Sequence, residues 1–492
     1  MNEIMMLIVV LIPFIIGALI PLLSFKTRRA FLIFMEAAVT VNSLLVWAML
    51  LAKPTESLTV FRFTGNLSIT LQVDGMGGLF AGMIAILWPL AMLYSFEYMK
   101  HENNEKSFFM FYVITYGVTL GVALAENILT MYFFFEMLSL ITLPLVMHTR
   151  TREAILASRT YLYYMLGGAA FAFIGMIFIL TYGTTSSFLP GGVIDMSRMV
   201  EKKDMMLLIY VICFCGFAVK TAMWPFSTWL PKAGVAPTPV TALLHAVAVV
   251  NTGAFATMRV TYFSFGAGTI RGSWAQYVVM ALVIITIVYG CSRAVKETHI
   301  KRRLAWSTVS NLSYILFGVV MMTPLGLVGA MAHMLFHSFM KICSFFCAGA
   351  VMYKTGRNYV HELDGFGRKM PKVFAIFTIS AFALMGVPGR CGFVSKWSLA
   401  KAAIESGNLL AVAGVGALLI SALLTAIYML SIVVRAYFPG EGFDYEKIKD
   451  VEDPNWMMLV PLMVFVVVMF VFGLYSGPVM KLLHEIAAVM EM

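Results

Sequence analysis

Apolar runs of about 20 residues follow one another along almost the whole chain. A helix needs about 20 predominantly apolar residues to cross the hydrocarbon core of a bilayer. Windows of that length predict fourteen membrane-spanning segments, and no polar domain separates them, so the pattern predicts one all-α polytopic membrane protein. The predicted segments are 4–23, 30–51, 78–97, 108–125, 127–147, 160–181, 205–223, 236–260, 275–290, 304–322, 325–352, 373–387 with a broken continuation to about 405, 409–435 and 456–475.

Two of these segments are interrupted. In the stretch 216–253, Lys220 and His245 flank a break made by Pro225, Pro231, Pro237 and Pro239, through which no continuous helix can run. The second break lies in GVPGRCGFVSKW (386–397), which contains Lys396. Irregular backbone at membrane depth is tolerated where protein or a water-filled cavity covers it. Paired breaks in the two halves of a chain indicate inverted repeats around a transport route.

Composition agrees with a membrane domain. The chain is 61% hydrophobic and 12% charged, whereas soluble domains are about 45–50% apolar and 25% charged. Twenty-two of the 35 Lys and Arg residues fall in the odd-numbered loops between predicted spans, and about eight fall in the even-numbered loops and the tails. The positive-inside rule then places the odd loops in the cytoplasm and both termini outside. This distribution also explains the net charge of +10, so we expect no nucleic-acid partner.

The first apolar run, 1–23, has no positively charged leader and no small-residue cleavage site. We therefore expect it to be retained as the first span rather than removed as a signal peptide. The expected location is a prokaryotic plasma membrane, with the bilayer as the surrounding medium.

Glu136 lies in the middle of the predicted span 127–147, and Lys220 is an isolated opposite charge in the same half of the chain. A charge at the bilayer centre costs roughly 2.5–3.5 kcal/mol on insertion scales, so such residues usually carry a function. We predict that the two groups form one electrostatic unit in adjacent helices. The alternatives are a hydrogen-bonded glutamate that packs helices and an ion pair with a purely structural role.

His333, His337 and Lys341 recur every four residues in MAHMLFHSFMKICSFF, so they share one helix face. Imidazole titrates near neutral pH and can both donate and accept hydrogen bonds. The stripe therefore predicts a hydrated proton path between the region of Lys220 and that of Lys396, with interhelical hydrogen bonding as the alternative. A zinc site would need a third acid or thiol ligand, and none continues the four-residue spacing of the two histidines, so we expect no metal.

Two further lysines and one histidine have two interpretations each. Lys396 is either the terminal group of the proton path or a lysine that extends to the membrane interface. His245 belongs either to the path or to helix packing. Lys301, in THIKRRLAWSTVS, is either a path residue or a membrane-edge anchor. Arg390 lies six residues before Lys396 and, if close to it, would disfavour its protonated form.

Motifs for other chemistry are absent from the sequence. There is no Walker loop, no dinucleotide fingerprint after a strand, no HExxH and no haem or iron–sulfur cysteine pattern. The six cysteines form no CxxC pair and lie in or beside apolar segments, so we expect small buried hydrophobes. We expect no cofactor, and the energy for any transport must come from an ion gradient or a partner.

The run KTAMWPFSTWLPKAGVAPTPVTALLHA (220–246) resembles the signature of the antiporter-like subunits shared by respiratory complex I, membrane-bound hydrogenases and Mrp-type sodium/proton antiporters. Supporting matches are VDGMGGLF at 73–80, FFEML at 134–138, IKRRLAWSTVSNLSY at 300–314, HSFMKICSF at 337–345 and RKMP at 368–371. The resemblance covers about residues 70–430. Because the chain stops soon after the fourteenth predicted span, the resemblance favours the antiporter D-type subunit or its hydrogenase-like relatives.

The resemblance implies a fold of fourteen helices with two inverted five-helix repeats, each containing a broken helix. Mapped onto this chain, 1–107 holds helices 1–3, 108–260 the first repeat, 275–435 the second repeat, and 436–492 a cytoplasmic loop and the last helix. The implied proton route runs from Glu136 through Lys220, His245 and the central His and Lys residues to Lys396. The chain departs from the signature at Ser227 (usually His), at Lys232 (usually Asp) and in Pro388–Phe393 (usually Pro-Pro-Leu-Ser-Gly-Phe).

We therefore expect a proton-translocating subunit, with sodium as a possible coupled ion, that works with other membrane subunits in a respiratory or Mrp-type complex. Two other functions remain open at this point. One is a stand-alone secondary transporter of a small solute, which would be active alone in liposomes. The other is a non-conducting scaffold for redox neighbours, which would tolerate neutralisation of Glu136.

Overall fold

The computed structural model describes residues 2–65 and 67–490. The described chain is mainly helical, with one pair of strands. In chain order the elements are α1 (Asn2–Leu19), α2 (Arg28–Ala52), β1 (Leu58–Thr64), β2 (Leu67–Leu71), α3 (Gly75–Tyr98), α4 (Glu105–Ala123), α5 (Ile128–Val146), α6 (Arg152–Tyr182), α7 (Lys203–Ala218), α8 (Trp229–Ala233), α9 (Thr238–Ala246), α10 (Val249–Arg259), a π-helical turn (Val260–Phe265), α11 (Ala267–Ile270), α12 (Trp274–Lys296), α13 (Ile300–Val320), α14 (Pro324–Thr355), α15 (Phe366–Lys369), α16 (Pro371–Met385), α17 (Cys391–Glu405), α18 (Leu409–Tyr437), α19 (Trp456–Leu474) and α20 (Gly477–Ala488).

Each of the fourteen predicted segments coincides with a helix or a broken pair of helices. Among the described residues, ten helices are both long enough and apolar enough to cross a membrane. The protein is thus an integral membrane protein of mainly helical structure. The number of fourteen spans and the two inverted repeats stay predictions.

The expectation of an all-α fold is wrong between α2 and α3. β1 and β2 pair antiparallel there, from Leu58 opposite Leu71 to Thr64 opposite Leu67. Alternating β-branched and aromatic residues in LTVFRFT and LSITL suit a half-buried sheet surface. A search with windows of 20 apolar residues passes over strands of five to seven residues.

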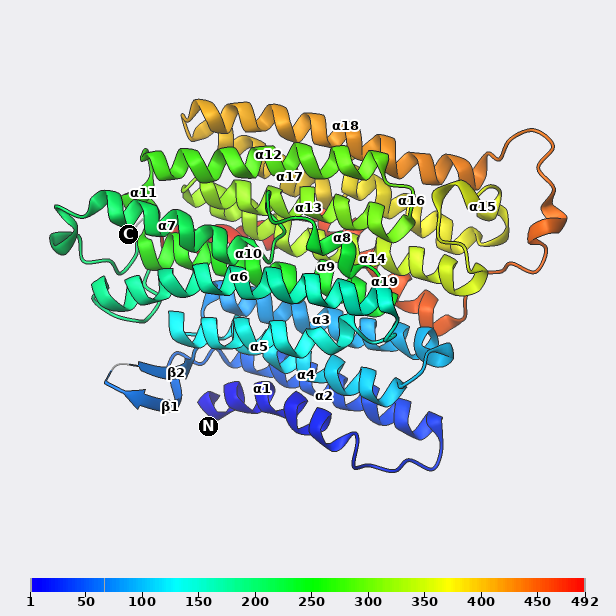
Figure 1. The fold of residues 1–492 in the computed structure, drawn as a ribbon, viewed down its shortest axis with the longest axis horizontal. Coiled ribbons are helices and arrows are strands. Elements are labelled where there is room, and N and C mark those ends of the chain that lie inside the picture. The colour runs from blue at the N-terminus through cyan, green and yellow to red at the C-terminus, as the bar shows by residue number, and fades with distance from the viewer. Residues whose placement is uncertain (1, 66, 491–492) are drawn as a thin grey trace.

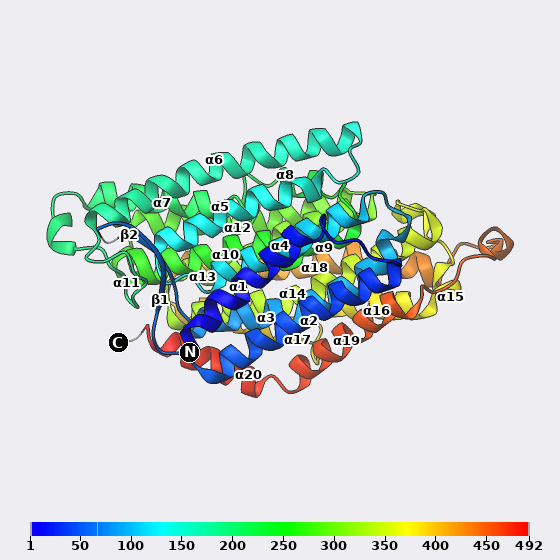
Figure 2. The ribbon, with the colours of Figure 1, turned by 90° about the horizontal axis from the view of Figure 1, so that it is seen from below.

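The long helices run side by side along the longest axis of the molecule (Figure 1). Both termini lie at one end of this bundle, and the α1–α2 and α18–α19 connections lie at the other (Figures 1 and 2). The common end for both termini agrees with the predicted topology, whereas the compartment that each end faces stays a prediction.

α14 forms the centre of the bundle, and every residue of its most apolar 18-residue window is buried. It packs against α9 on one side and against α16 and α17 on another. These neighbours are pieces of the interrupted segments, so the central helix contacts both breaks. A lipid-facing helix can present polar groups only at a cost, whereas α14 presents them to other helices.

Both breaks that the sequence predicts are present. α7 ends at Ala218 and α8 begins at Trp229, while α16 ends at Met385 and α17 begins at Cys391. A third interruption, which the sequence analysis did not predict, separates α9 from α10 at 247–248. No proline or glycine marks it, but Asn251 donates to the freed carbonyl of Ala246 (2.8 Å) and to the Ser338 hydroxyl on α14 (2.7 Å).

Candidate functional site

Lys220 lies just after the end of α7, where the helix gives way to irregular turns. Its side chain is buried, and Nζ donates a hydrogen bond to the carbonyl of Phe135 on α5. Nζ also lies 3.4 Å from the centroid of the Phe135 ring, a cation–π contact. The lysine therefore binds the residue that directly precedes Glu136.

The carboxylate of Glu136 does not close an ion pair with Lys220. Among the residues that the structure describes, no Lys220–Glu136 contact within 4.0 Å is present, and Glu136 Oε1 is buried without a hydrogen-bond partner. The structure thus brings the two groups to neighbouring positions without joining them. A buried oxygen without a partner is costly in this form, which suits a group that exchanges a proton or a water molecule.

His333, His337 and Lys341 lie along one face of α14, and all three are fully buried. The two imidazole rings stack with their centroids 5.8 Å apart. His333 Nδ1 lies 2.9 Å from the Ser395 hydroxyl on α17, whereas His333 Nε2 and both nitrogens of His337 have no partner among the described groups. Lys341 Nζ donates to the Ser307 hydroxyl on α13 (2.7 Å).

His245 and Lys301 bring the first break into contact with this face. His245, on α9, is fully buried with both ring nitrogens unpartnered, and its ring packs 4.9 Å from that of Phe345 on α14. Lys301, on α13, is also buried, and Nζ donates to the carbonyl of Ala236 (2.8 Å), which lies between α8 and α9. An anchor would direct its ammonium outward, so the membrane-edge interpretation of Lys301 is wrong.

Lys396 lies in the second turn of α17 and is partly buried. Its Nζ donates to the carbonyls of Leu384 (2.6 Å) and Met385 (3.2 Å), which end α16. These carbonyls have no partner within their own helix and carry the negative end of its dipole, so they stabilise a cation. Nζ also lies 5.1 Å from the centroid of the Tyr314 ring.

Arg390 points away from this lysine. Its guanidinium carbon lies 3.9 Å from the centroid of the Phe470 ring on α19, and Nη1 donates to the Gly389 carbonyl (3.3 Å). The departure of the sequence at Pro388–Phe393 therefore places an arginine against α19.

Hydroxyl groups between the charged residues are the functional candidates that sequence reasoning missed. Ser307, Tyr314, Ser395, Ser421 and Tyr428 are all buried and hydrogen-bonded beside the histidine and lysine side chains. Serine and tyrosine occur throughout membrane helices, so their identity alone gives no signal. The four-residue spacing of Ser307 and Asn311, which share a face of α13, was the available clue.

An ion pair between a buried arginine and a partly exposed aspartate also escaped the sequence analysis. Arg259, at the end of α10, donates to both carboxylate oxygens of Asp74 at 2.5 and 2.6 Å. Burial by itself would raise the pKa of Asp74, but the charge of Arg259 and hydrogen bonds from Arg259 and the Gly77 N–H lower it below the usual value. Asp74 caps the N-terminus of α3, so this pair ties α3 to the end of α10.

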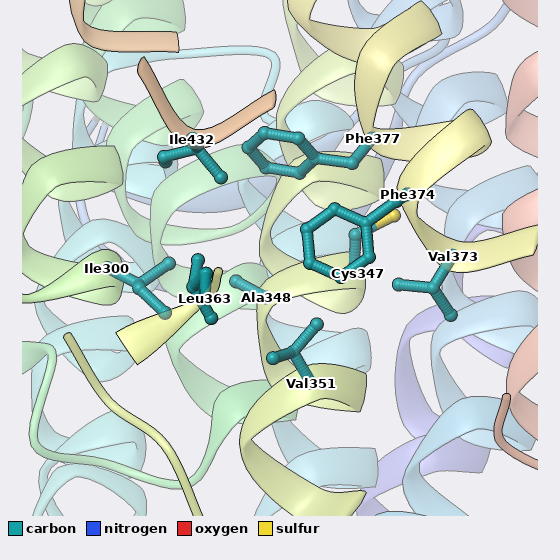
Figure 3. Close-up of a pocket in the computed structure, with 9 residues that line it drawn as sticks. All are labelled: Ile300, Cys347, Ala348, Val351, Leu363, Val373, Phe374, Phe377 and Ile432. Carbon is teal, nitrogen blue, oxygen red and sulfur yellow. The ribbon is translucent and has the colours of Figure 1, made fainter. Parts of the chain in front are cut away.

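An apolar pocket lies beside the C-terminal half of α14 (Figure 3). Its cavity volume of about 10 Å³ is no more than one water molecule needs. The lining holds no charged or hydroxyl side chain and consists of Ile300, Cys347, Ala348, Val351, Leu363, Val373, Phe374, Phe377 and Ile432. The pocket offers an ion no charged or hydroxyl partner, so it adds no group to the row on α14.

The gathered side chains are of kinds that can exchange protons. In the part of the chain that the structure describes, no three His, Cys, Asp or Glu side chains gather as ligands of one metal ion would. Lysine and histidine side chains are groups that can take up and release protons.

Comparison with known families identifies the chain. A family model described as NADH:quinone oxidoreductase/Mrp antiporter, TM matches residues 125–424. A second, described as the N-terminus of NADH-ubiquinone oxidoreductase (complex I) chain 5, matches residues 62–109. The chain belongs to the NADH:quinone oxidoreductase/Mrp antiporter transmembrane family.

Individual relatives agree with this assignment. Na(+)/H(+) antiporter subunit A1 of Staphylococcus aureus is 28% identical over 499 residues, which cover 96% of this chain and 61% of the relative. The chain thus spans less than two thirds of the length of that curated relative. The relatives of this kind are A-type subunits, and the expected resemblance to a D-type subunit stays a prediction.

Three solved structures share the fold. A chain of the Mrp complex from Dietzia sp. has a TM-score of 0.86 at 21% identity, covering 99% of this chain and 52% of that one. A chain of the archaeal membrane-bound sulfane sulfur reductase has a TM-score of 0.82 at 21% identity, with coverage of 99% and 97%. A chain of respiratory complex I from Thermus thermophilus has a TM-score of 0.82 at 20% identity, with 99% of each chain covered.

Proposed function

We propose that the chain is a proton-translocating, antiporter-like subunit of a multisubunit membrane complex. In this proposal protons move along Glu136, Lys220, His245, the row of Lys341, His337 and His333, and Lys396. The observation that carries the proposal is that His245 and Lys396 lie on helices that pack against α14, where several polar atoms of these groups are buried without a fixed partner. Lys220 lies beside Gly253 of α10, which contacts both α7 and α14. Unpartnered polar atoms can bind a transient water or proton without first breaking an existing hydrogen bond.

The path has a chemical order. Lys220 and Lys396 each lie next to a helix break and donate to backbone carbonyls. The histidines between them lack fixed partners on at least one nitrogen. A lysine held by neutral carbonyls is able to release its proton, because among the described residues no carboxylate within 4.0 Å fixes its charge. The histidines can then carry protons between lysines through water.

Partner subunits follow from the relatives rather than from the chain alone. The solved structures with this fold come from an Mrp complex, a sulfane sulfur reductase and complex I, and each is a membrane assembly. We propose that this chain likewise works with other membrane subunits and transports H⁺, with Na⁺ as the candidate coupled ion. The end that carries both termini would face the outside, following the distribution of Lys and Arg.

The test is transport by the chain together with its co-purifying subunits in liposomes. An imposed ion gradient should drive a pH change that a trapped pH-sensitive dye reports, and Glu136→Gln should remove it. Glu405→Gln is the matched control, because Glu405 is an exposed glutamate paired with Lys401 on the surface of α17, and it should transport normally. Full activity of the chain without partner subunits would instead indicate a stand-alone carrier, and normal activity of Glu136→Gln would contradict the proposed path.

A further inference from the structure

Lys341 has one hydrogen-bond partner among the described side chains, the Ser307 hydroxyl on α13, at 2.7 Å. The same oxygen accepts a hydrogen bond from the hydroxyl of Tyr428 on α18, at 2.8 Å. A serine oxygen has two lone pairs and one proton. Ser307 is therefore placed between a lysine, whose charge can change, and a tyrosine, whose charge stays constant near neutral pH.

Tyr428 has a choice of acceptors. Besides Ser307, its hydroxyl lies 3.1 Å from Thr425 Oγ1 on the same helix. Tyr428 carries one hydroxyl proton, so it can fully satisfy one of these two oxygens at a time. Thr425 itself donates to the backbone carbonyl of Ser421 (2.7 Å) and so remains free to accept.

The position of Tyr428 is fixed from its backbone. Arg303, on α13, donates to the carbonyl of Tyr428 (3.1 Å) and to the Ser431 hydroxyl (2.7 Å). These contacts join α13 to α18 close to the Ser307 and Tyr428 hydroxyls. The ring is therefore held in place, and rotation of its O–H bond is the freedom that remains.

We propose that Tyr428 is a positioning residue for Lys341, because its hydroxyl turns between Ser307 and Thr425 as Lys341 loses or gains a proton. This inference rests on the proposed function. When Lys341 is neutral, Ser307 donates to Nζ and Tyr428 donates to Ser307. When Lys341 is charged, Nζ donates to Ser307, Tyr428 donates to Thr425, and the tyrosine oxygen is free to accept from Ser307.

Both arrangements keep the hydrogen bonds of Lys341, Ser307 and Tyr428 satisfied. The lysine gains or loses one proton, and each hydroxyl proton only turns about its C–O bond. Without the tyrosine hydroxyl, Ser307 has no acceptor for its own proton whenever Lys341 is charged. An unmade buried hydrogen bond is costly. Tyr428 thus stabilises the charged state of a lysine that has no carboxylate within 4.0 Å among the described residues.

Other ionisable groups surround Lys341 and act on the same equilibrium. His337 precedes it on α14, His245 lies on α9 and Lys396 on α17, while Lys301 on α13 acts on His245. Arg303 acts on Tyr428 through the backbone carbonyl. None of these groups donates to or accepts from the Ser307 hydroxyl in the described structure, so the tyrosine effect can be separated from theirs.

The first experiment compares Tyr428→Phe with Tyr116→Phe in the reconstituted complex. Tyr116 is an equally buried tyrosine whose hydroxyl bonds a serine, Ser43, at 2.8 Å in the helices before α5. Tyr428→Phe should slow ion flux by about tenfold, the effect of losing a hydrogen bond linked to a charge, and should move the pH dependence of flux toward lower pH. Tyr116→Phe should leave both unchanged, and an unaltered rate and pH profile in Tyr428→Phe would overturn the inference.

A second experiment needs no transport and therefore separates this inference from the proposed function. Infrared difference spectra between high and low pH should contain a tyrosine band that disappears in Tyr428→Phe and stays in Tyr116→Phe. The band should also disappear in Lys341→Met and in Ser307→Ala, because both changes uncouple the tyrosine from the lysine. A band that persists in both of these variants would overturn the inference, even if the complex pumps normally.

Discussion

The two interrupted segments hold their lysines in different ways. Lys220, beside the first break, reaches across to the carbonyl of Phe135 on another helix, next to the unpartnered carboxylate of Glu136. Lys396, after the second break, turns back to the last carbonyls of α16, within its own interrupted segment. In both cases the break supplies space for an ammonium group, but the source of stabilisation differs.

The two lysines therefore differ in the group that stabilises a cation at membrane depth. Near Lys220 the opposite charge belongs to Glu136, which lies beyond ion-pair distance and is a side chain that can itself take up a proton. Near Lys396 the stabilisation comes from the free carbonyls and the dipole of a helix end, which cannot change with pH. We therefore expect the first lysine to depend on its neighbour and the second to respond mainly to its own proton.

The largest effect should come from Lys220→Ala and Glu136→Gln. Each change removes one member of a pair of opposite charges in a low-dielectric region, so each should abolish ion movement. Both complexes should still assemble, because among the described residues no ion pair within 4.0 Å ties the two helices together. Flux in liposomes and the subunit content of the purified complex are the measurements. A fully coupled Lys220→Ala complex would refute the prediction that Glu136 and Lys220 act as one unit.

Lys396→Arg should have a nearly equal effect on flux but for another reason. Arginine keeps the charge and can still donate to the carbonyls of Leu384 and Met385, yet it does not give up its proton. The same substitution at Lys401 is a control, because Lys401 is exposed on the same helix and pairs with Glu405. Normal pumping by Lys396→Arg would show that Lys396 serves as an anchor or packing group.

The smallest effect should come from Arg390→Gln. The guanidinium packs on Phe470, and a cation–π contact contributes about 0.5–2 kcal/mol, so the purified complex should melt at a slightly lower temperature. Flux and its pH dependence should stay close to those of the unmodified protein, because Arg390 makes no contact with Lys396 among the described hydrogen bonds and ion pairs. A clear shift in the pH profile would mean that Arg390 acts on Lys396.

The positions of the helices and of two breaks could be predicted from the sequence. Apolar runs of about 20 residues predicted helices that the structure contains, and prolines predicted the end of α7 near Lys220. The shared face of His333, His337 and Lys341 also follows from helical spacing alone. These features depend on neighbouring residues along the chain, and local physical chemistry therefore determines them.

Contacts between distant segments required the tertiary structure. The hydrogen bond of Lys301 to Ala236, the stacking of Arg390 on Phe470 and the Asp74–Arg259 pair each join residues more than 60 positions apart. The hydroxyl of Tyr428 reaches Ser307 only because α18 packs beside α13.

The sequence by itself therefore determined a membrane protein of apolar helices, two interrupted segments and a row of ionisable groups. The packing of these helices decided which carbonyl, ring or hydroxyl each ionisable group contacts. The physical reason is that hydrophobicity and backbone preferences act over a few residues. A buried ammonium, by contrast, takes whichever acceptor the neighbouring helices bring within about 3 Å.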